Sequence, residues 1–229
     1  MNGLNQTSSC LSCPCGCMNN FIGDEDLCLI DENKCSLFFN EGEVIFKQGS
    51  YVSQIAHIKT GYVKMVLEAR NGRQTILNII SPDNFIGIQT VGNQAQYPFS
   101  VIALTRVEVC FIKEGTIREI LNNTIMSNQF VLNWLANDNA YMNEKIVTIS
   151  TRNSHGKLAS ALVYLTSNEF EDDVLNMLSR KELAEFSAIS VESLNKILLQ
   201  LKNDRIIELN KKGIIVKRRD LIVKLSAVG

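Results

Sequence analysis

The sequence predicts an α+β protein in which a β-rich part precedes a helical part. Between Leu37 and Cys110, short runs rich in β-branched residues alternate with turn signals, and no helical pattern interrupts them. Short strands at this spacing are typical of a β-sandwich or barrel. From Glu114 onward, apolar residues recur every three or four positions, which is the period of a helix.

The composition fits a globular protein of one large or two smaller domains, with 229 residues, 45% hydrophobic and 21% charged. The sequence holds no run of about eighteen apolar residues and no signal-peptide pattern, so we expect a cytoplasmic protein without a membrane span. Residues 1–151 carry 10 Lys and Arg against 14 Asp and Glu, whereas residues 152–229 carry 13 against 10. This basic end mildly favours contact with nucleic acid.

The N-terminal segment SSCLSCPCGCM crowds four of the seven cysteines together: Cys10, Cys13, Cys15 and Cys17. Disulfides are uncommon in a reducing compartment, so this odd number of cysteines favours metal, redox chemistry or burial over a disulfide framework. We expect a loop that becomes ordered with a ligand or a partner. A short helix should follow around Glu25 to Glu32.

The β-rich part contains short runs that predict strands: VIF (44–46), QIAHIK (54–59), YVKMVLEA (62–69), QTILNII (74–80), FIGIQ (85–89), FSVIAL (99–104) and VEVCFIK (107–113). Asn71-Gly72 lies between two of these runs and is a strong hairpin signal. A tight two-residue turn of this kind requires positive φ at both central residues.

Two helices are predicted next, over residues 114–123 and 124–151. The second helix has no Pro or Gly, and its apolar positions include Phe130, Val131, Trp134, Leu135, Tyr141, Met142, Ile146 and Ile149. Such a helix either lies across its own domain or packs against a partner helix. We favour a dimer seam, because the helix is longer than a small β domain can cover.

The last block, residues 152–229, predicts a helix–turn–helix after a first helical run over 156–170. Ser179 and Glu182 form a capping-box pattern, so a helix should start at Arg180. Ser190 should cap a second helix that runs to about Asn203 and buries Ile197, Leu198 and Leu201. The runs IIEL (206–209) and IIVK (214–217) predict a hairpin with a basic tip.

The second helix of such a motif enters the major groove with its N-terminal residues first. The residues expected at this face are Ser190, Val191, Glu192, Asn195 and Lys196. Glu accepts from cytosine N4, Asn pairs with adenine, and Lys donates to guanine O6 and N7. We expect Lys211, Lys212, Arg218 and Arg219 to contact DNA phosphates. Such contacts position the protein on the duplex but do not specify the base sequence. The alternative is that this charged helix face contacts only solvent and does not bind DNA.

From about Leu27 to Leu225 the chain resembles the CRP/FNR transcription regulators. The resembling stretches are NEGEVIFKQG (40–49), IKTGYVKM (58–65), ISPDNFIG (80–87) and SRKELAEFSAISVESLNKILLQL (179–201). The resemblance implies a cyclic-nucleotide-binding-like β-roll (jelly roll), a long dimerisation helix and a C-terminal winged helix–turn–helix. We therefore expect a cysteine-rich segment over 1–22, the β-roll over 23–122, the dimerisation helix over 123–151 and the DNA-binding domain over 152–229.

This resemblance implies a homodimeric regulator that binds pseudo-palindromic double-stranded DNA and works with RNA polymerase. FNR-type members carry Glu, Ser and Arg where this chain has Glu192, Asn195 and Lys196, so Glu192 and Lys196 are the expected base readers. No enzyme is expected, because the sequence shows no nucleophile–base constellation. His57 and His155 are far apart in sequence and are assigned no function.

Cyclic AMP is not expected to bind. The CRP branch uses a Gly-Glu pair for the ribose and an Arg-Ser pair whose Arg faces the cyclic phosphate. The matching stretches here read IGIQ and PFSVIAL, with neither the Glu nor the Arg. A buried phosphate without a cationic partner is costly.

The cysteines resemble the ligands of FNR-type regulators, which hold a [4Fe–4S] cluster with three N-terminal cysteines and one in the β-roll. The implied ligands are Cys10, Cys13, Cys17 and Cys110, with Cys15 as the alternative third ligand. The spacing C-x2-C-x-C-x-C departs from the C-x2-C-x5-C of those proteins. Zinc and a plain redox thiol switch are alternatives. Cys28 and Cys35 are expected to be core residues.

The predicted function is therefore transcription regulation in response to redox state, oxygen or nitric oxide. One alternative is a regulator of the same family whose β-roll binds a small effector or haem, with no cluster. A second alternative, from another class, is a ligand-binding regulatory subunit that acts on a partner protein.

Overall fold

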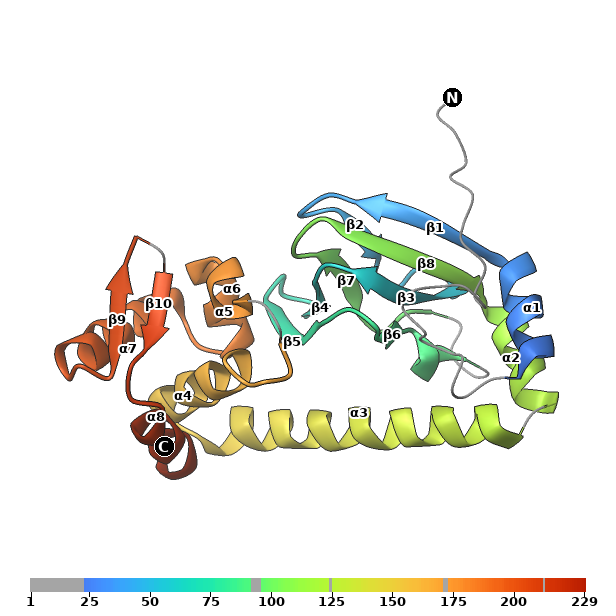
Figure 1. Cartoon of the computed structure of the whole chain (residues 1–229). Helices are drawn as coiled ribbons and strands as arrows, with labels where there is room; N and C mark the ends of the chain where they lie inside the picture. Colours follow the sequence, from blue (N-terminus) through green and yellow to red (C-terminus); the bar gives the residue numbers. More distant parts are fainter. Residues whose placement is uncertain (1–22, 92–95, 124, 171–172, 212) are drawn as a thin grey trace. The chain divides into compact units, whose positions relative to one another are not determined.

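A computed structural model describes residues 23–91, 96–123, 125–170, 173–211 and 213–229 (Figure 1). The described residues form two compact units. The first unit comprises the chain up to Leu67 together with Ile79–Ala140, and the second comprises Glu68–Asn78 together with Tyr141–Gly229. The structure mixes sheets and helices, which confirms the predicted α+β class. None of the helices in the described ranges is both long and apolar enough to cross a membrane.

The β-rich part contains two four-stranded sheets, with strand orders β1-β8-β3-β6 and β2-β7-β4-β5. Strands β1 and β3 both pair antiparallel with β8, which lies between them. The strand bounds are β1 (Lys34–Phe39), β2 (Val44–Phe46), β3 (Gln54–Thr60), β4 (Val63–Glu68), β5 (Gln74–Ile80), β6 (Phe85–Ile86), β7 (Ser100–Ala103) and β8 (Val107–Lys113). The runs 44–46, 74–80 and 107–113 match their predicted bounds. The run 85–89 was predicted as one strand, but only Phe85–Ile86 is a strand, and the short 3-10 helix η2 (Ile88–Thr90) follows it.

Helices α1 (Asp24–Glu32) and α2 (Glu114–Asn123) lie beside each other at one end of strands β1 and β8 (Figure 1). Their apolar faces build one core cluster with side chains from the strands and from the 3-10 helix after β6: Leu27, Ile30, Ile55, Phe85, Ile88, Ile112, Ile117 and Ile120. The same cluster receives Phe130, Val131 and Trp134 from the following helix α3 (Ile125–Thr151). Three of the eight apolar residues that predicted a dimer seam therefore pack within the first unit.

The second unit contains the expected helix–turn–helix and hairpin with two short additions. Its elements are α4 (Ser154–Leu165), α5 (Val174–Met177), α6 (Arg180–Phe186), α7 (Val191–Asn203), β9 (Ile207–Asn210), β10 (Gly213–Val216) and α8 (Arg219–Val228). The sequence did not predict α5 or α8. Helix α4 ends before the predicted residue 170, and its last turn is followed by the bonded turn in which Ser167 N donates to the carbonyl oxygen of Tyr164.

The turn between β4 and β5 differs from its prediction. Of Asn71 and Gly72, Gly72 alone has a positive φ, at 77°. The Asn71 side chain instead accepts a hydrogen bond from the backbone N of Arg73 at 3.1 Å. Because five residues connect the strands, the loop does not require the two-residue turn that places both central residues at positive φ.

The prediction that Cys28 and Cys35 are core residues is wrong, because both side chains are exposed. Cys28 lies between Leu27 and Ile30, which point into the core, and so falls on the outer face of α1. Cys35 occupies an outward position of β1, which is an edge strand of its sheet.

Gly61 is a position where we predict that an added methyl group destabilises the first unit. Its φ is +80°, and a Cβ there would lie 2.7 Å from Val107 Cγ1 and would overlap the carbonyl oxygen of Arg106. Gly49 has a similar φ of +82° with open space around it. Left-handed backbone costs an L-residue about 1–2 kcal/mol. Gly49→Ala should therefore lower the free energy of unfolding by about that amount.

Gly61→Ala should cost about 1–3 kcal/mol more than Gly49→Ala, because overpacking adds to the backbone strain. Urea unfolding of both variants measures the difference. Equal losses of stability would show that the contact with Val107 and Arg106 relaxes without cost.

Candidate nucleic-acid interface

Helix α6 begins at Arg180, as the capping pattern predicted. Ser179 Oγ accepts a hydrogen bond from the backbone N of Glu182 at 3.2 Å, and the Glu182 carboxylate accepts one from Ser179 N at 2.8 Å. This reciprocal pair satisfies two backbone donors that the first turn leaves without partners. The start of the first helix of the motif is thereby fixed.

The turn between α6 and α7 is held by backbone bonds from both sides. Ser187 N donates to Leu183 O, Ile189 N donates to Ala184 O, each at 3.0 Å, and Ala188 adopts a left-handed φ of 52°. Ser190 then caps α7, since its Oγ accepts from Ser193 N at 3.1 Å. The two helices are therefore joined by a short turn that backbone hydrogen bonds hold.

Helix α7 has one buried and one exposed face. The buried face consists of Leu194, Ile197, Leu198 and Leu201, three of which the sequence analysis named. Val191, Glu192, Asn195 and Lys196 are exposed at its N-terminal half, as predicted. The described structure records no ion pair between Glu192 and Lys196, so neither charge is neutralised by the other along the helix. Their chemistry suits hydrogen bonding to base edges.

The hairpin of β9 and β10 is fixed to the short helix α5 through Asn176. Its Oδ1 accepts from Ile214 N at 2.7 Å, and its Nδ2 donates to Ile214 O at 3.1 Å. This amide fills the space beside Gly213, where φ is +126°. Lys211, at the tip, is exposed. Lys212 lies outside the described residues.

Two other predicted phosphate partners have protein partners in this structure. Arg218 forms an ion pair with Asp220 at 3.1 Å, and this hydrogen-bonded arginine lowers the pKa of the Asp220 carboxyl. Arg219 donates through Nη1 to Thr166 O at 2.7 Å and to Thr166 Oγ1 at 2.8 Å. Lys211 is therefore the better-placed candidate for a phosphate.

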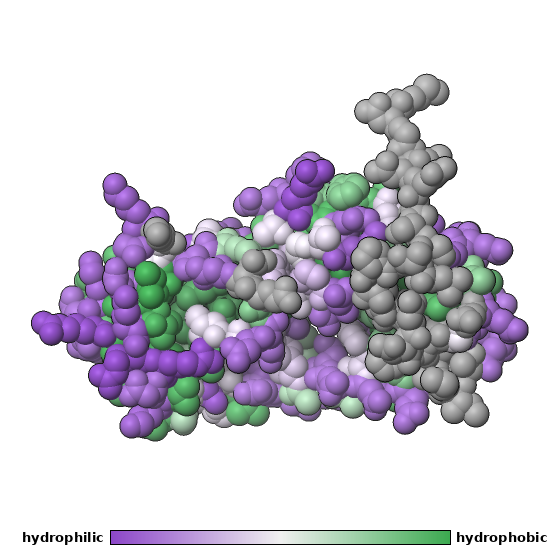
Figure 2. All heavy atoms as spheres, in the orientation of Figure 1, coloured by the Kyte–Doolittle hydropathy of each residue, from purple (hydrophilic) through white to green (hydrophobic). Residues whose placement is uncertain are grey.

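Sequence reasoning missed Arg180 and Lys181, which are exposed in the first turn of α6. The first helix of a helix–turn–helix crosses the DNA backbone, and that rule could have identified them. Figure 2 shows mainly hydrophilic side chains, with apolar patches between them, over β9, β10 and α7 at the left of the view. Exposed cations on α6 and at the hairpin tip accompany the polar face of α7.

In the first unit, Cys110 is a half-buried thiol on β8 that packs against the core cluster of α1 and α2. It pairs across strands with His57 on β3 and Ser36 on β1. Burial lowers the pKa of His57 to about 4, with Lys59 adding to the effect, and its Nε2 lies 3.9 Å from Asp83 Oδ1. His57 is therefore neutral at physiological pH, and so carries no charge beside Cys110.

The four N-terminal cysteines lie outside the described residues. Within the ranges that the structure describes, no three His, Cys, Asp or Glu side chains gather as a metal site. Cys17 is six residues from Gly23, so the intervening chain spans at most about 20 Å. Cys110 lies against the same cluster as Leu27 and Ile30 of α1, the helix that follows this segment. Thiolates from Cys110 and from the N-terminal cysteines have the chemistry that an iron–sulfur or zinc centre requires.

The described side chains around β6 and the start of β7 are mainly apolar. Residues 85–104 contain no Lys or Arg to meet a phosphate. Tyr97 stacks on Phe46 with ring centroids 4.3 Å apart, and its hydroxyl donates to the carbonyl oxygen of Gln54. Ile88 and Phe99 are also buried here. An anionic ligand in this apolar space would lose its hydration without gaining a cation.

Two family models match the chain. The model described as cyclic nucleotide-binding domain matches residues 36–124, and the model described as Crp-like helix-turn-helix domain matches residues 156–225. The first match covers most of the β-rich part, and the second covers most of the residues from α4 to α8.

Similar proteins include an anaerobic regulatory protein of Bacillus subtilis, 24% identical over 186 residues, which are 78% of this chain and 78% of that protein. The transcriptional activator protein FnrL of Cereibacter sphaeroides is 20% identical over 204 residues, which are 84% of this chain and 80% of that protein. The solved structure of FixK2 from Bradyrhizobium japonicum superposes with a TM-score of 0.75 at 13% identity, covering 86% of this chain and 98% of that one.

Proposed function

Because the chain belongs to the CRP/FNR family of transcription regulators, we propose that it is a homodimeric regulator that binds pseudo-palindromic duplex DNA and senses redox state, oxygen or nitric oxide. The sensing centre is held by N-terminal cysteines and Cys110. Half-sites lie about one helical turn, roughly 34 Å, apart, and the protein acts in the cytoplasm with RNA polymerase.

The observation that carries DNA recognition is the exposed polar face at the start of α7. Its orientation is fixed by the buried leucine and isoleucine side chains opposite and by the Ser190 cap. Glu192, Asn195 and Lys196 supply an acceptor, an amide and a cation within about one turn. These three groups can distinguish cytosine, adenine and guanine in the major groove.

Dimerisation is supported by the face of α3 that its own chain leaves exposed. Leu132 is 66% exposed, Ile146 62% and Val147 53%. Between Asn128 and Thr151, Glu144 is the only charged residue among the exposed positions of this helix. A solvent-facing helix surface normally carries many charges. Leu132, Ala136, Asn139, Asn143 and Ile146 follow steps of three and four residues, which is the pattern of a coiled-coil seam.

The proposed centre is a [4Fe–4S] cluster held by Cys10, Cys13, Cys17 and Cys110, with Cys15 as the alternative third ligand. Four thiolates suit such a cluster, which would supply reactivity toward oxygen and nitric oxide. The chain itself fixes the position of Cys110. Strands β1 and β3 pair with β8 on either side, and the Cys110 side chain packs against the core cluster that α1 helps to form. The names of the anaerobic relatives support a redox signal.

Lys196→Ala should relax specificity at one base pair and cost about 1–3 kcal/mol of binding there, because a base contact is lost. Lys211→Ala should weaken binding to all sequences similarly and reduce the salt slope by about one, because a phosphate contact is lost. Fluorescence anisotropy on a set of single-substitution duplexes at two or more salt concentrations separates the two effects. A uniform loss for Lys196→Ala would contradict its role as a base reader.

Ile146→Glu should convert the dimer to a monomer, since two carboxylates would face each other in the seam. Sedimentation equilibrium measures the mass. Val223→Glu is the matched control, because Val223 is also an exposed, β-branched apolar residue but lies on α8. A wild-type protein that is monomeric, or an Ile146→Glu variant that remains a dimer, would contradict the seam.

Cys110→Ser should abolish iron binding, whereas Cys35→Ser should leave it unchanged. Cys35 is an exposed thiol on the neighbouring strand, one position from the cross-strand partner of Cys110. Anaerobic purification followed by iron, sulfide and zinc analysis and an absorption spectrum provides the test. Bound zinc without sulfide would show that the cysteines form a zinc site and not a cluster. A metal-free wild-type protein would contradict the proposed centre.

A further inference from the structure

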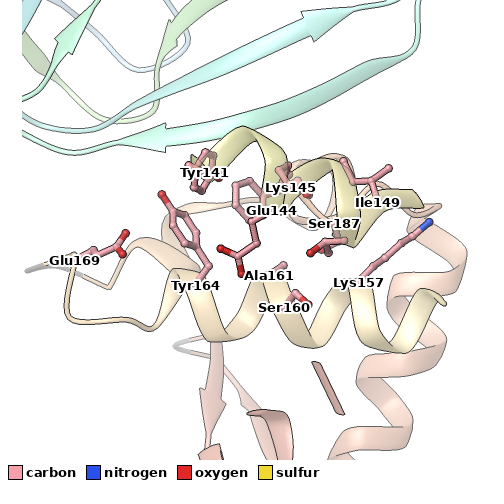
Figure 3. A pocket seen from close by; sticks show the side chains of 12 residues that line it. Tyr141, Glu144, Lys145, Ile149, Lys157, Ser160, Ala161, Tyr164, Glu169 and Ser187 are labelled. Carbon is pink, nitrogen blue, oxygen red and sulfur yellow. Dashed lines mark hydrogen bonds between the residues drawn. The ribbon is translucent and has the colours of Figure 1, made fainter. Parts of the chain in front are cut away.

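The second unit contains a cavity of about 140 Å³ between the last turns of α3, the helix α4 and the end of α6 (Figure 3). We call it the α3–α4 cavity. Its wall includes Tyr141, Lys145, Ile149, Lys157, Tyr164 and Ser187. Nothing in the proposed DNA-binding, dimerisation or cysteine chemistry uses this space.

Lys145 brings a buried cation to the cavity wall. Its Nζ donates to the carbonyl oxygen of Phe186 at 2.8 Å and lies 3.4 Å from the centroid of the Phe186 ring. The described residues offer it no carboxylate within ion-pair distance. Burial therefore lowers the pKa of Lys145 to about 7.

Ser187, which follows Phe186 in the chain, adds a hydroxyl to the same wall. The residue is 3% exposed, and its Oγ has no hydrogen-bond partner among the described residues. A buried hydroxyl without a partner costs about 1–3 kcal/mol. The cavity wall thus offers one cation and one hydrogen-bond donor at the same end of α6.

The rest of the wall is mainly apolar. Tyr141 and Tyr164 use their hydroxyls elsewhere, donating to Leu77 O at 3.1 Å and to Asn78 Oδ1 at 2.8 Å, so their rings form wall surface. Ile149 and Ala161 add aliphatic surface. The volume is close to that of an engineered cavity of about 150 Å³ that admits benzene.

We propose that the α3–α4 cavity binds a small monocarboxylate whose carboxylate pairs with Lys145 and accepts a hydrogen bond from Ser187, and whose benzene-sized apolar body lies against the tyrosine and isoleucine side chains. A neutral molecule of the same shape leaves the ammonium without a counter-charge. A dicarboxylate places its second charge near Glu144 and Glu169, which also line the cavity.

Proton uptake follows from this pairing. The charged groups that line the cavity together with Lys145 are Glu144 on α3, Lys157 on α4 and Glu169 after α4. The two tyrosines are neutral, because burial raises their pKa. At pH 8 the amine of Lys145 is mostly neutral. A bound carboxylate favours the ammonium form, so binding takes up close to one proton at pH 8 and much less at pH 6.

Isothermal titration calorimetry of the full-length protein with benzoate, phenylacetate and hexanoate tests this site without DNA. We expect saturable one-to-one binding of at least one of these acids with a dissociation constant of 1 mM or tighter, corresponding to about −4 kcal/mol. Benzyl alcohol, the neutral counterpart, should bind at least tenfold more weakly. Repeating the titration at pH 8 in buffers of different ionisation enthalpy measures the proton uptake.

Lys145→Met keeps the side-chain volume and should abolish both carboxylate binding and proton uptake. Ser187→Ala should weaken binding several-fold without lowering the melting temperature, because the hydroxyl has no partner in the unliganded protein. Lys202→Met is the control, since Lys202 is an exposed lysine outside the cavity. No saturable binding of any of the three acids at up to about 10 mM, or equal binding by Lys145→Met, would overturn the proposal.

Discussion

The burial of one face of α7 is the constraint on which the rest of the DNA-binding unit depends. Leu194, Ile197, Leu198 and Leu201 fill the core, and burial of side chains of this size contributes about 1.5–3 kcal/mol each. A helix held this firmly cannot rotate about its axis. The directions of Glu192, Asn195 and Lys196 are therefore set by apolar packing on the opposite side, and not by any contact that these three residues make themselves.

The parts of the site that could be predicted from the sequence are those that depend on residues close together in the chain. The capping residues Ser179 and Ser190 act through bonds to residues three positions on, so local sequence suffices to place both helix starts. The strong period of α7 likewise identifies its buried face. The remaining positions of α7 must then be exposed, so the sequence alone identifies the candidate base readers.

The predictions that were wrong, and the features that the sequence missed, depend on tertiary context. Cysteine is usually buried, but Cys28 and Cys35 occupy outward positions set by neighbouring core residues and by an edge strand. The partners of Arg219 come from a segment more than fifty positions away, so sequence alone could not exclude it from the phosphate partners. Helix α5 is a single turn, and its role depends on Asn176 reaching the hairpin.

The outward position of Cys28 and Cys35 has a practical consequence for redox work on this protein. Exposed thiols react with alkylating and oxidising reagents largely according to their accessibility and thiolate content. A thiol titration of the folded chain therefore counts these two residues as a background unrelated to the N-terminal cysteines. A Cys28→Ser, Cys35→Ser double variant provides a clean baseline, and each of the two positions offers a site for a fluorescent or spin label on the first unit.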